Sequence, residues 1–338
     1  MAPFLRVRAS GTHRQIGRAI GKATAQIVRV LVAENAAFYR RKIRKDLRRM
    51  IALARKNYLP FAQKKFPRFM IELEGIAEGA GLTLDQILPF SLEEELLDRF
   101  AVEKCSTAAI RTRSGLLLGH NEDFGLRYRN RLVMVEARPA GRPAFLSLSY
   151  PGTLAGSSCG LNGAGIAMAN DSLNFIAERG IPKNFIFRAV LEARTMAEIE
   201  KTMRIGPRAI GLGITAVSSR EHAVTAIETT PKDVAVLSIG KASALTHTNH
   251  VLSPKIDRRA EKPTRSSRVR LAGLDRFLAR GGGALTEKDL ERCLSSKKNW
   301  LLREQTLASV IMDPARRTLR LINRHAPSPE WTEYKLAK

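Results

Sequence analysis

Cysteine is scarce in this chain, which has three cysteines in 338 residues: Cys105, Cys159 and Cys293. They are too few and too widely spaced for a disulfide framework, and the zinc-binding patterns Cys-x-x-Cys and His-Glu-x-x-His do not occur. The composition therefore predicts reduced thiols in a cytoplasmic protein, with no metal and no cofactor.

Long apolar runs are also missing. No stretch approaches the roughly 18 uninterrupted apolar residues of a membrane-spanning helix. Residues 1–8 lack the basic region and long apolar core that mark a secretory signal. Hydrophobic residues nevertheless make up 44% of the chain, enough for a substantial core. We expect a globular, soluble protein that is not exported by the secretory route.

Acidic residues are outnumbered, because 57 Lys and Arg stand against 32 Asp and Glu, for a net charge of +25. Residues 1–68 carry 18 basic residues and two acidic ones, whereas residues 69–104 carry nine acids and two bases. From residue 40 to residue 56 apolar side chains recur every three or four positions. This spacing predicts one helix with an apolar stripe and a densely basic remainder.

The basic helix has three interpretations. It could bind nucleic acid or an anionic membrane, it could attract an anionic substrate or carrier, or it could be the solvated face of a basic protein. Aromatic residues, which stack on bases, make up only 6% of the chain, and no nucleic-acid motif accompanies the charge. We therefore favour the solvated face.

The chain divides into a helical part, a strand-rich part and a mixed part. Helical periodicity covers residues 11–100, with a capping box at Thr83 and Gln86. Short strands separated by Gly, Pro and Asn follow over residues 105–169. Further expected elements are helices at 69–80, 184–203 and 266–279, strands at 214–217, 223–228 and 233–239, a polar linker at 253–265, and a hairpin of 306–313 with 318–322. This order predicts an α+β protein with helices outside two sheets.

One predicted hairpin joins a thiol to polar residues. Cys105 precedes a short run of small, β-branched and aliphatic residues, a Ser-Gly pair supplies the turn, and an apolar run then ends at Asn121-Glu-Asp123. Each strand residue advances the chain by about 3.3 Å, so two paired strands of this length bring their outer ends together. The pattern therefore predicts that Cys105 meets Asn121 and Asp123 at one edge of a sheet.

Six sequence blocks follow one another over nearly the whole chain: Gly-rich residues 11–21, Glu-rich residues 72–82, Cys105-Ser-Thr with Gly-His-Asn-Glu-Asp-Phe at 119–124, Gly-rich residues 160–170, Thr-His-Thr-Asn-His at 246–250, and Thr-Leu-Ala-Ser-Val-Ile-Met-Asp at 306–313. Together they resemble the isopenicillin-N acyltransferase family. The resemblance implies the four-layer αββα sandwich of the N-terminal nucleophile hydrolases and a chain that cuts itself between Lys104 and Cys105. Residues 1–104 would then be a helical segment released by autoproteolysis, and residues 105–338 the catalytic part of one integrated domain.

The resemblance also implies roles for the matching residues. Cys105 would be the nucleophile, and its own α-amine, with a pKa of about 8, would take the thiol proton. Asp123 resembles the carboxylate that orients this amine, and Asn249 resembles the amide donor of an oxyanion hole. Taken alone, these residues would have plain structural alternatives: a small buried hydrophobe, a turn carboxylate and a loop amide bound to its own backbone.

Five further residues belong to the expected site. Asn121 resembles a polar neighbour of the nucleophile, Asn170 a partner near the oxyanion hole, and Thr306 and Ser309 lie in the block that the family uses for substrate and nucleophile contacts. Arg303 could pair with a substrate carboxylate, on the basis of its nearness in sequence. Lys104 departs from the small residue that often precedes the nucleophile in the family. A bulkier residue adopts strained backbone conformations less readily, so we expect slow or incomplete processing.

Three other motifs compete with this site. Gly156-Ser-Ser158-Cys-Gly160 matches the nucleophile elbow of α/β-hydrolases, with His250 as base, but a strand-like segment follows where a helix is required. A relaxed dinucleotide fingerprint at 211–216 likewise runs into a strand. His247 and His250 could bind a metal, yet no thiol or carboxylate cluster adjoins them in the sequence. We discount all three and expect a structural or substrate-side role for the two histidines.

The sequence therefore predicts an N-terminal-cysteine enzyme that hydrolyses small N-acyl amides, with acyl transfer to an amine as the close alternative. Its partners would be the N-acyl amide, an acyl-CoA donor in the transfer reaction, and its own N-terminal chain after cleavage. The competing hypothesis, which we do not favour, is a catalytically silent basic protein of the same fold that binds nucleic acid or an anionic membrane surface.

Overall fold

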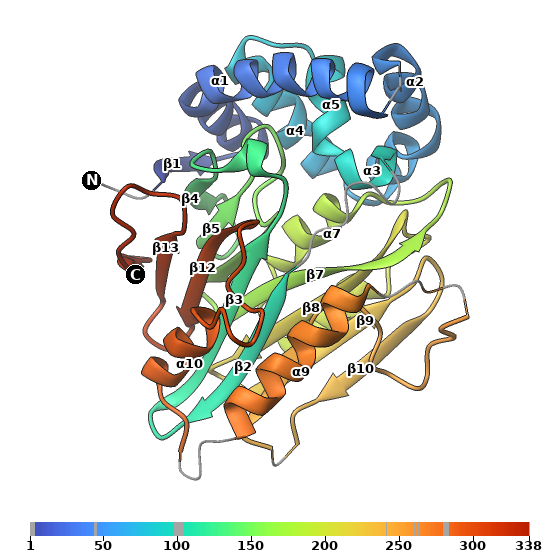
Figure 1. Cartoon of the computed structure of the whole chain (residues 1–338). Helices are drawn as coiled ribbons and strands as arrows, with labels where there is room; N and C mark the ends of the chain where they lie inside the picture. Colours follow the sequence, from blue (N-terminus) through green and yellow to red (C-terminus); the bar gives the residue numbers. More distant parts are fainter. Residues whose placement is uncertain are drawn as a thin grey trace.

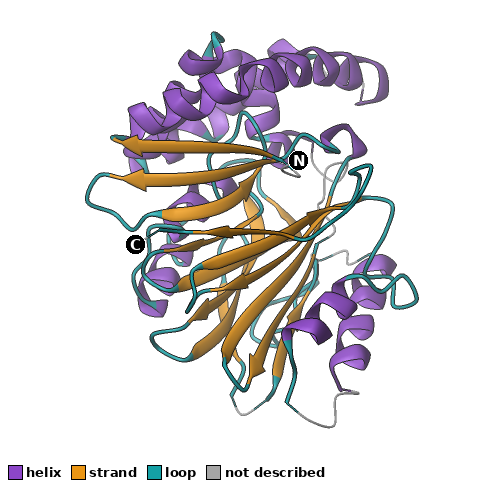
Figure 2. Cartoon of the chain, turned by 90° about the vertical axis from the view of Figure 1, so that its left-hand side faces the viewer, coloured by secondary structure: helices purple, strands orange, loops and turns teal. Residues whose placement is uncertain are grey.

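Two β-sheets lie face to face between two layers of helices (Figure 1, Figure 2). The computed structural model describes residues 4–43, 46–97, 105–240, 242–259, 261, 264–279 and 284–337. The layers confirm the predicted αββα sandwich. Lys104, which precedes the predicted cut, lies outside the described residues.

The larger sheet has the strand order β1-β4-β5-β6-β7-β8-β9-β10. Its strands are β1 Leu5–Gly11, β4 Val133–Pro139, β5 Phe145–Ser149, β6 Cys159–Asn162, β7 Ile166–Ile176, β8 Ile210–Ser218, β9 Ala223–Thr229 and β10 Val234–Ser238. β1 runs parallel to β4, and sequence analysis did not predict it. Its alternation of Leu5, Val7 and Ala9 with arginines was the available signal.

The smaller sheet is antiparallel, in the order β11-β2-β3-β12-β13-β14. Its strands are β11 Ala244–His247, β2 Ser106–Thr112, β3 Gly115–Asp123, β12 Thr306–Asp313, β13 Thr318–Asn323 and β14 Thr332–Lys335. Both predicted hairpins, β2 with β3 and β12 with β13, are confirmed.

Helices cover the outer face of each sheet. Over the larger sheet lie α1 His13–Phe38, the π-helical turn η1 Tyr39–Ile43, α2 Leu47–Asn57, α3 Leu59–Lys65, α4 Pro67–Ala80, α5 Leu84–Ser91, α6 Glu93–Leu97, α7 Lys183–Val190 and α8 Met196–Met203. Over the smaller sheet lie α9 Arg265–Ala279 and α10 Glu287–Leu294, and a 3-10 turn, η3 Leu126–Tyr128, follows β3. The apolar core consequently has three main layers, one between the sheets and one beneath each helical layer. No described helix is long and apolar enough to cross a membrane.

Glycines let α1 and α4 approach each other backbone to backbone. A Cβ on Gly17 would lie 2.1 Å from the carbonyl oxygen of Glu72, and a Cβ on Gly79 would lie 2.2 Å from that of Arg18. Real side chains do not tolerate such distances, so only glycine fits at either position. This contact gives a physical reason for the glycines in the first two blocks of the sequence.

Two predicted helices are each divided in the structure. The basic segment 40–56 is not one helix, because Asp46 accepts a hydrogen bond from the backbone N–H of Arg48 at 3.0 Å and starts α2 as a new helix. The segment 184–203 likewise divides into α7 and α8, because Thr195 caps α8. The predicted capping box of Thr83 and Gln86 at the start of α5 is confirmed.

Candidate active site

Cys105 lies at one end of the smaller sheet, immediately before β2. Ser106 pairs with Asn121 of β3, and Asp123 of β3 pairs with Thr306 of β12. The three strands therefore present their site residues at the same end of the sheet. The predicted meeting of Cys105 with the Asn121–Asp123 segment is confirmed at the level of strand pairing.

The thiol of Cys105 is fully buried, and its Sγ lies 3.7 Å from Oε1 of Glu122. Glu122 also accepts hydrogen bonds from the Tyr150 hydroxyl at 2.6 Å and from the Ser158 hydroxyl, and it lies 3.0 Å from Nε2 of His120. Burial raises the pKa of Glu122, but the contacts with His120, Ser158 and Tyr150 outweigh burial and lower it. The thiol thus faces a buried carboxylate that is held in its ionised form.

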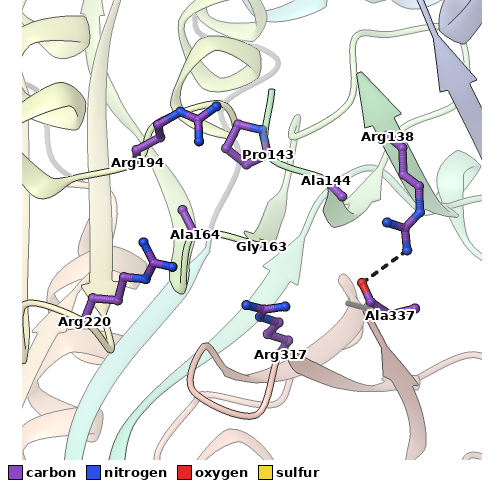
Figure 3. A pocket seen from close by; sticks show the side chains of 9 residues that line it. All are labelled: Arg138, Pro143, Ala144, Gly163, Ala164, Arg194, Arg220, Arg317 and Ala337. Atoms are coloured by element: carbon purple, nitrogen blue, oxygen red, sulfur yellow. Dashed lines mark hydrogen bonds between the residues drawn. The ribbon is translucent and has the colours of Figure 1, made fainter. Parts of the chain in front are cut away.

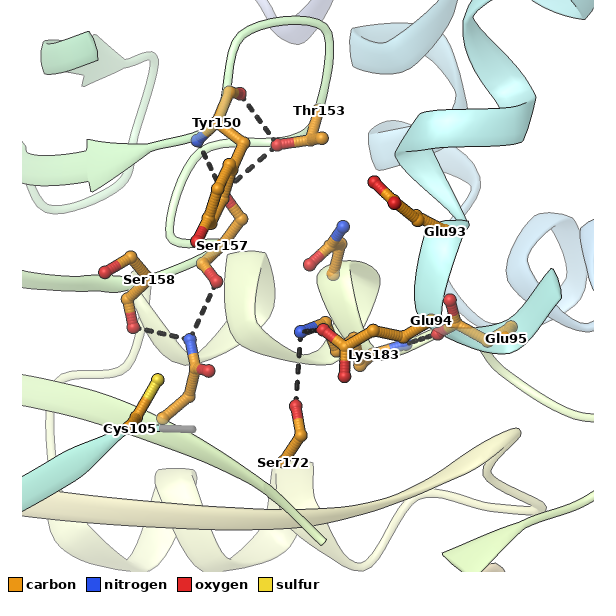
Figure 4. A network of polar contacts seen from close by, with 12 residues as sticks. Glu93, Glu94, Glu95, Cys105, Tyr150, Thr153, Ser157, Ser158, Ser172 and Lys183 are labelled. Carbon is orange, nitrogen blue, oxygen red and sulfur yellow. Dashed lines mark hydrogen bonds and ion pairs between the residues drawn. The ribbon is translucent and has the colours of Figure 1, made fainter. Parts of the chain in front are cut away.

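Ser158 belongs to this network rather than to a nucleophile elbow. β6 begins directly after it, whereas the elbow requires a helix there. In Figure 4 the side chain of Cys105 points toward Ser158, with Tyr150 beyond it. The hydroxyl of Ser158 donates to Glu122, so the rejection of the elbow is confirmed.

Asp123 is a buried carboxylate with little to stabilise its charge. The residue is 1% exposed, neither carboxylate oxygen accepts a hydrogen bond from a described residue, and the Arg303 guanidinium lies 3.8 Å away. Burial raises the pKa of Asp123 to about 6, although Arg270, the nearby Thr306 hydroxyl and Arg303 act in the opposite direction. A buried acceptor without a donor is rare in folded proteins and calls for an explanation.

Asn249 follows β11, which pairs with the other edge of β2. Its Nδ2 donates to the carbonyl oxygen of Ser172 in β7 at 3.1 Å, and its Oδ1 accepts from Nη2 of Arg270 in α9 at 2.7 Å. Nη1 of Arg270 also donates to the carbonyl oxygen of Cys105 and to Oγ of Ser106, 3.0 Å away. Arg270, which is fully buried, therefore ties Asn249 to the segment that carries the thiol.

Two of the other expected residues hold loops in place. Nδ2 of Asn121 donates to the carbonyl oxygens of Leu294 at 3.0 Å and Leu301 at 2.7 Å, and its Oδ1 accepts from Ser309. Ser309 in turn accepts from Nε of Arg324 at 2.8 Å. Asn121 and Ser309 thus fasten the end of α10 and the loop after it to the sheet.

Asn170, in β7, fastens the turn that carries Ser158. Its Nδ2 donates to the carbonyl oxygen of Ser157 at 2.9 Å and to that of Ser158, while its buried Oδ1 has no hydrogen-bond partner in the described part of the chain. This contact fixes the Ser158 hydroxyl that binds Glu122.

Thr306 and Arg303 lie together at the open end of the sheet. Oγ1 of Thr306 accepts from the backbone N–H of Arg303 at 2.9 Å, and both residues line a surface pocket together with Lys297 and Arg324. In the structure Nη1 of Arg303 lies 3.8 Å from Oδ2 of Asp123.

A cation could be held by donors around the thiol. Atoms of Cys105, His120 and Glu122 lie within 4.8 Å of one another, and they form the one such group within the described part of the chain. However, Glu122 already binds Tyr150 and Ser158, and Nδ1 of His120 lies 3.0 Å from the Thr107 hydroxyl. The donors are thus engaged with one another, which favours a hydrogen-bonded network over a metal site.

His247 and His250 do not act as a pair. Nδ1 of His247 lies 3.1 Å from Asp171, and its Nε2 lies 3.0 Å from Glu228. Burial lowers the pKa of His247, but the two carboxylates outweigh burial and raise it to about 10. His250 instead contacts Ser267 at 2.7 Å. The two carboxylates that contact His247 are therefore distant from it in sequence. Glu228 also accepts hydrogen bonds from the backbone N–H groups of residues 252 and 253, which follow Asn249. His247 thus helps to hold this loop, which is a structural role.

Sequence analysis missed several parts of this site. Glu122 and His120 lie within a quoted block, and their spacing of two along a strand places both on one face, which was a usable signal. Arg270 gave no signal, since it is one of several arginines in a basic helix.

A second pocket lies away from the thiol. Four of the residues that line it are arginines: Arg138, Arg194, Arg220 and Arg317 (Figure 3). Arg220 follows β8 and Arg317 lies in the turn between β12 and β13, so the pocket is at the end of the sheets opposite to Asp123 and Thr306.

Two known proteins are similar to parts of this chain. The β-alanyl-dopamine/carcinine hydrolase of Drosophila melanogaster is 28% identical over 159 residues, which are 41% of this chain and 41% of that protein. The solved N-acylethanolamine-hydrolyzing acid amidase ortholog of Caenorhabditis elegans has 16% sequence identity and a TM-score of 0.49, over 62% of this chain and 93% of that one.

Two further matches concern one family, and the second of them, a family model, carries the family assignment. The acyl-coenzyme A:6-aminopenicillanic-acid-acyltransferase 40 kDa form of Emericella nidulans is 25% identical over 254 residues, which are 74% of this chain and 70% of that protein. The family model described as acyl-coenzyme A:6-aminopenicillanic acid acyl-transferase matches residues 110–326. The predicted family is thereby confirmed, together with the prediction of an enzyme of acyl transfer and amide hydrolysis. The chain belongs to the acyl-coenzyme A:6-aminopenicillanic acid acyl-transferase family.

Proposed function

We propose that this chain cuts itself between Lys104 and Cys105 and then hydrolyses small N-acyl amides through an acyl-enzyme on Cys105. The observation that carries the proposal is Asp123, a buried carboxylate whose oxygens accept no hydrogen bond from a described residue, at the same sheet end as the thiol. An ammonium group created at Cys105 by cleavage would supply the missing hydrogen-bond donor.

Self-cleavage would proceed by transfer of the chain from nitrogen to sulfur. Sγ of Cys105 attacks the carbonyl carbon of Lys104, the C–N bond breaks, and the thiol proton passes to the departing nitrogen. Water then attacks the thioester, leaving a carboxylate on Lys104 and restoring the thiol. Arg270, which holds the Cys105 carbonyl oxygen, positions this segment during the step.

The α-amine of Cys105 would then act as the base of the mature enzyme. An α-amine has an unperturbed pKa of about 8, close to that of a thiol. It takes the thiol proton as Sγ attacks the acyl carbon of the substrate, and it passes that proton to the leaving amine. Asp123 orients the amine, and the new positive charge would draw the pKa of Asp123 down from about 6.

Asn249 would stabilise the oxyanion formed during attack. Its Nδ2 donates one hydrogen to the carbonyl oxygen of Ser172, and its second hydrogen can be donated to a substrate oxygen. Arg270 holds Oδ1, so the amide cannot turn its oxygen toward the reacting carbonyl. Among the other expected residues, Asn170, Asn121 and Ser309 act as positioning residues through the loops they bind, and Thr306 and Arg303 lie beside Asp123.

Resolution of the acyl-enzyme decides between hydrolysis and transfer. Water attacking the thioester carbon releases a carboxylic acid, whereas a second amine attacking the same atom makes a new amide. We favour hydrolysis, with transfer from an acyl-CoA or an amide donor as the alternative outcome.

Mass spectrometry of purified protein tests the proposal. The wild type should give chains of 104 and 234 residues (338 − 104), the longer beginning Cys-Ser-Thr-Ala. Cys105→Ala should remain intact and release no amine from N-acyl anilides, whereas Cys293→Ala, which removes a buried thiol of α10, should be processed normally. One uncut, fully active wild-type chain would contradict the proposal, and salt-sensitive binding of DNA or anionic vesicles as the sole property would favour the silent protein.

A further inference from the structure

A narrow pocket lies beside the proposed nucleophile, between the sheets and α6. Tyr150 and Ser157 line one side of it, while Glu93, Glu94 and Glu95 of α6 line the other. The pocket adjoins the thiol network, because the Tyr150 hydroxyl donates to the same carboxylate of Glu122 that Sγ of Cys105 contacts. α6 belongs to the segment that precedes the proposed cut.

Lys183, at the start of α7, carries the cation of this pocket. Its side chain is 5% exposed, and its Nζ pairs with Glu94, whose side chain is 3% exposed. The backbone N–H of Lys183 donates to Oε1 of Glu95 at 2.8 Å. One buried ammonium thus faces a carboxylate donated by the N-terminal segment (Figure 4).

Ser172 contacts both the Lys183 ammonium and Asn249, the proposed oxyanion donor. Its Nζ is 3.3 Å from Oγ of Ser172, and the carbonyl oxygen of the same Ser172 accepts the hydrogen bond from Nδ2 of Asn249. A carboxylate held at Lys183 would therefore belong to a molecule whose amide reaches Asn249 and Cys105.

The carboxylate of Glu94 is incompletely satisfied. Its second oxygen, Oε2, is buried and has no hydrogen-bond partner among the residues that the structure describes, and the same holds for Oδ1 of Asn184 on the pocket wall. Burying a lysine and a glutamate away from water is unfavourable. The attraction between the two charges offsets this desolvation only when their remaining hydrogen bonds are also made. A carboxylate with one unbonded oxygen next to a reaction centre is therefore weak as a structural element but suitable as a replaceable one.

We propose that Lys183 anchors the carboxylate of an anionic N-acyl amide substrate, and that Glu94 holds this position in the uncut chain. The inference rests on the proposed function. It assigns the substrate class, an amide with a carboxylate on its acyl or its amine part, and it gives the acidic segment before the cut a role as an internal competitor. Cleavage at Cys105 separates α6 from the catalytic part and lets a substrate carboxylate replace Glu94.

Matched substrates test the anchor by turnover. One pair, glutaryl- and butyryl-4-nitroanilide, differs by a carboxylate on the acyl part, and the other, N-butyryl-4-aminobenzoate and butyrylanilide, differs by one on the amine part. The processed wild type should prefer the carboxylate-bearing member of one pair in kcat/KM. Lys183→Met/Glu94→Gln, which removes both charges together and so avoids an unpaired buried glutamate, should lose that preference by about 10-fold to 100-fold, the loss expected for one hydrogen bond to a charged group. Lys201→Met, at an exposed position on α8, should keep it.

Calorimetry on uncut chains separates the anchor from the catalytic proposal. Glutaryl-4-nitroanilide or N-butyryl-4-aminobenzoate should bind Cys105→Ala/Glu94→Gln at least about 10-fold more tightly than Cys105→Ala alone, and further removal of Lys183 should abolish the gain. No gain with Glu94→Gln, or an unchanged preference without Lys183, would overturn the anchor while leaving the nucleophile intact. If a chain that begins at Cys105 binds these anilides but hydrolyses none of them, the proposed function is refuted instead.

Discussion

Two pockets, one beside Cys105 and one at the other end of the sheets, differ in how their charged residues are placed. Beside Cys105, charges are buried and face one another, as Lys183 does with Glu94. In the pocket at the other end of the sheets, Arg138, Arg194 and Arg220 are exposed, and carbonyl oxygens rather than carboxylates accept from two of them: Ala337 from Arg138 at 3.1 Å, and Gly141 from Arg194 at 3.2 Å.

This difference shows that the net charge of +25 says little about the active site. Salt screens exposed charges beyond a Debye length of about 8 Å at physiological ionic strength, whereas it hardly affects buried pairs. The arginine pocket should therefore respond to salt and contribute little to stability. The interior pairs should respond to pH and to substitution.

The largest expected effect is the loss of the buried cation His247. His247→Leu leaves Asp171 and Glu228 buried without a countercharge, which should cost about 3–5 kcal/mol of unfolding free energy. Arg220→Leu, in the exposed pocket, should cost less than about 0.5 kcal/mol. Urea unfolding of both variants on the Cys105→Ala background measures the contrast, and similar losses in the two variants would break it.

The same comparison has a defined pH dependence. The pKa of His247 is raised to about 10 in the folded protein, against about 6.5 for an unfolded chain. The stabilisation by its charge is therefore fully present below pH 6.5 and is lost as the pH rises toward 10. The difference between wild type and His247→Leu should shrink over that interval. A constant difference would mean that shape, not charge, makes the contribution of His247.

The next effect concerns rate rather than stability. Asn249→Ala removes the proposed oxyanion donor and should lower kcat by about 100-fold to 1000-fold. Any residual activity should come from chains whose N-terminus is Cys105, which N-terminal sequencing verifies. Arg220→Ala should change kcat by less than about twofold, because it lies at the opposite end of the sheets. An Asn249→Ala enzyme of normal rate would assign the oxyanion to other donors.

Local features of this molecule were predictable because their signals are local. The hairpin of β2 and β3, the capping box of α5 and the meeting of Cys105 with the end of β3 follow from residues that are neighbours in sequence. The prediction of one continuous basic helix rested on apolar spacing alone. Asp46, a common type of N-cap residue, was the signal that a new helix starts within this segment.

Long-range contacts left no such signal. Arg270 lies 165 residues from Cys105, and Lys183 lies 89 residues from Glu94. Each is one basic residue among many, and only the folded chain reveals which carboxylate or carbonyl it meets. The pattern around His247 was misleading for the same reason, because its two carboxylates come from β7 and β9.

A third prediction uses the buried charge of Asp123. Its pKa of about 6 in the folded, uncut chain exceeds the unfolded value of about 3.9, so stability falls as the pH rises from 4 to 6. On the Cys105→Ala background, Asp123→Asn should raise the unfolding free energy by up to about 3 kcal/mol at pH 8 and by little at pH 4, because each unit of pKa shift corresponds to about 1.4 kcal/mol. Destabilisation at pH 8 would show that the carboxylate is already well paired before cleavage.

The smallest effect is expected at the rim of the arginine pocket. Arg317 has a φ of 56° in the turn between β12 and β13, a conformation that glycine adopts without strain. Arg317→Gly should therefore raise the unfolding free energy by up to about 1 kcal/mol, despite the added freedom of the unfolded chain. Arg316→Gly is the matched control, since Arg316 is not among the described residues with positive φ and should gain nothing. Thermal unfolding of the two variants distinguishes a backbone effect from relief of repulsion among arginines, because only repulsion would stabilise both variants and fade in high salt.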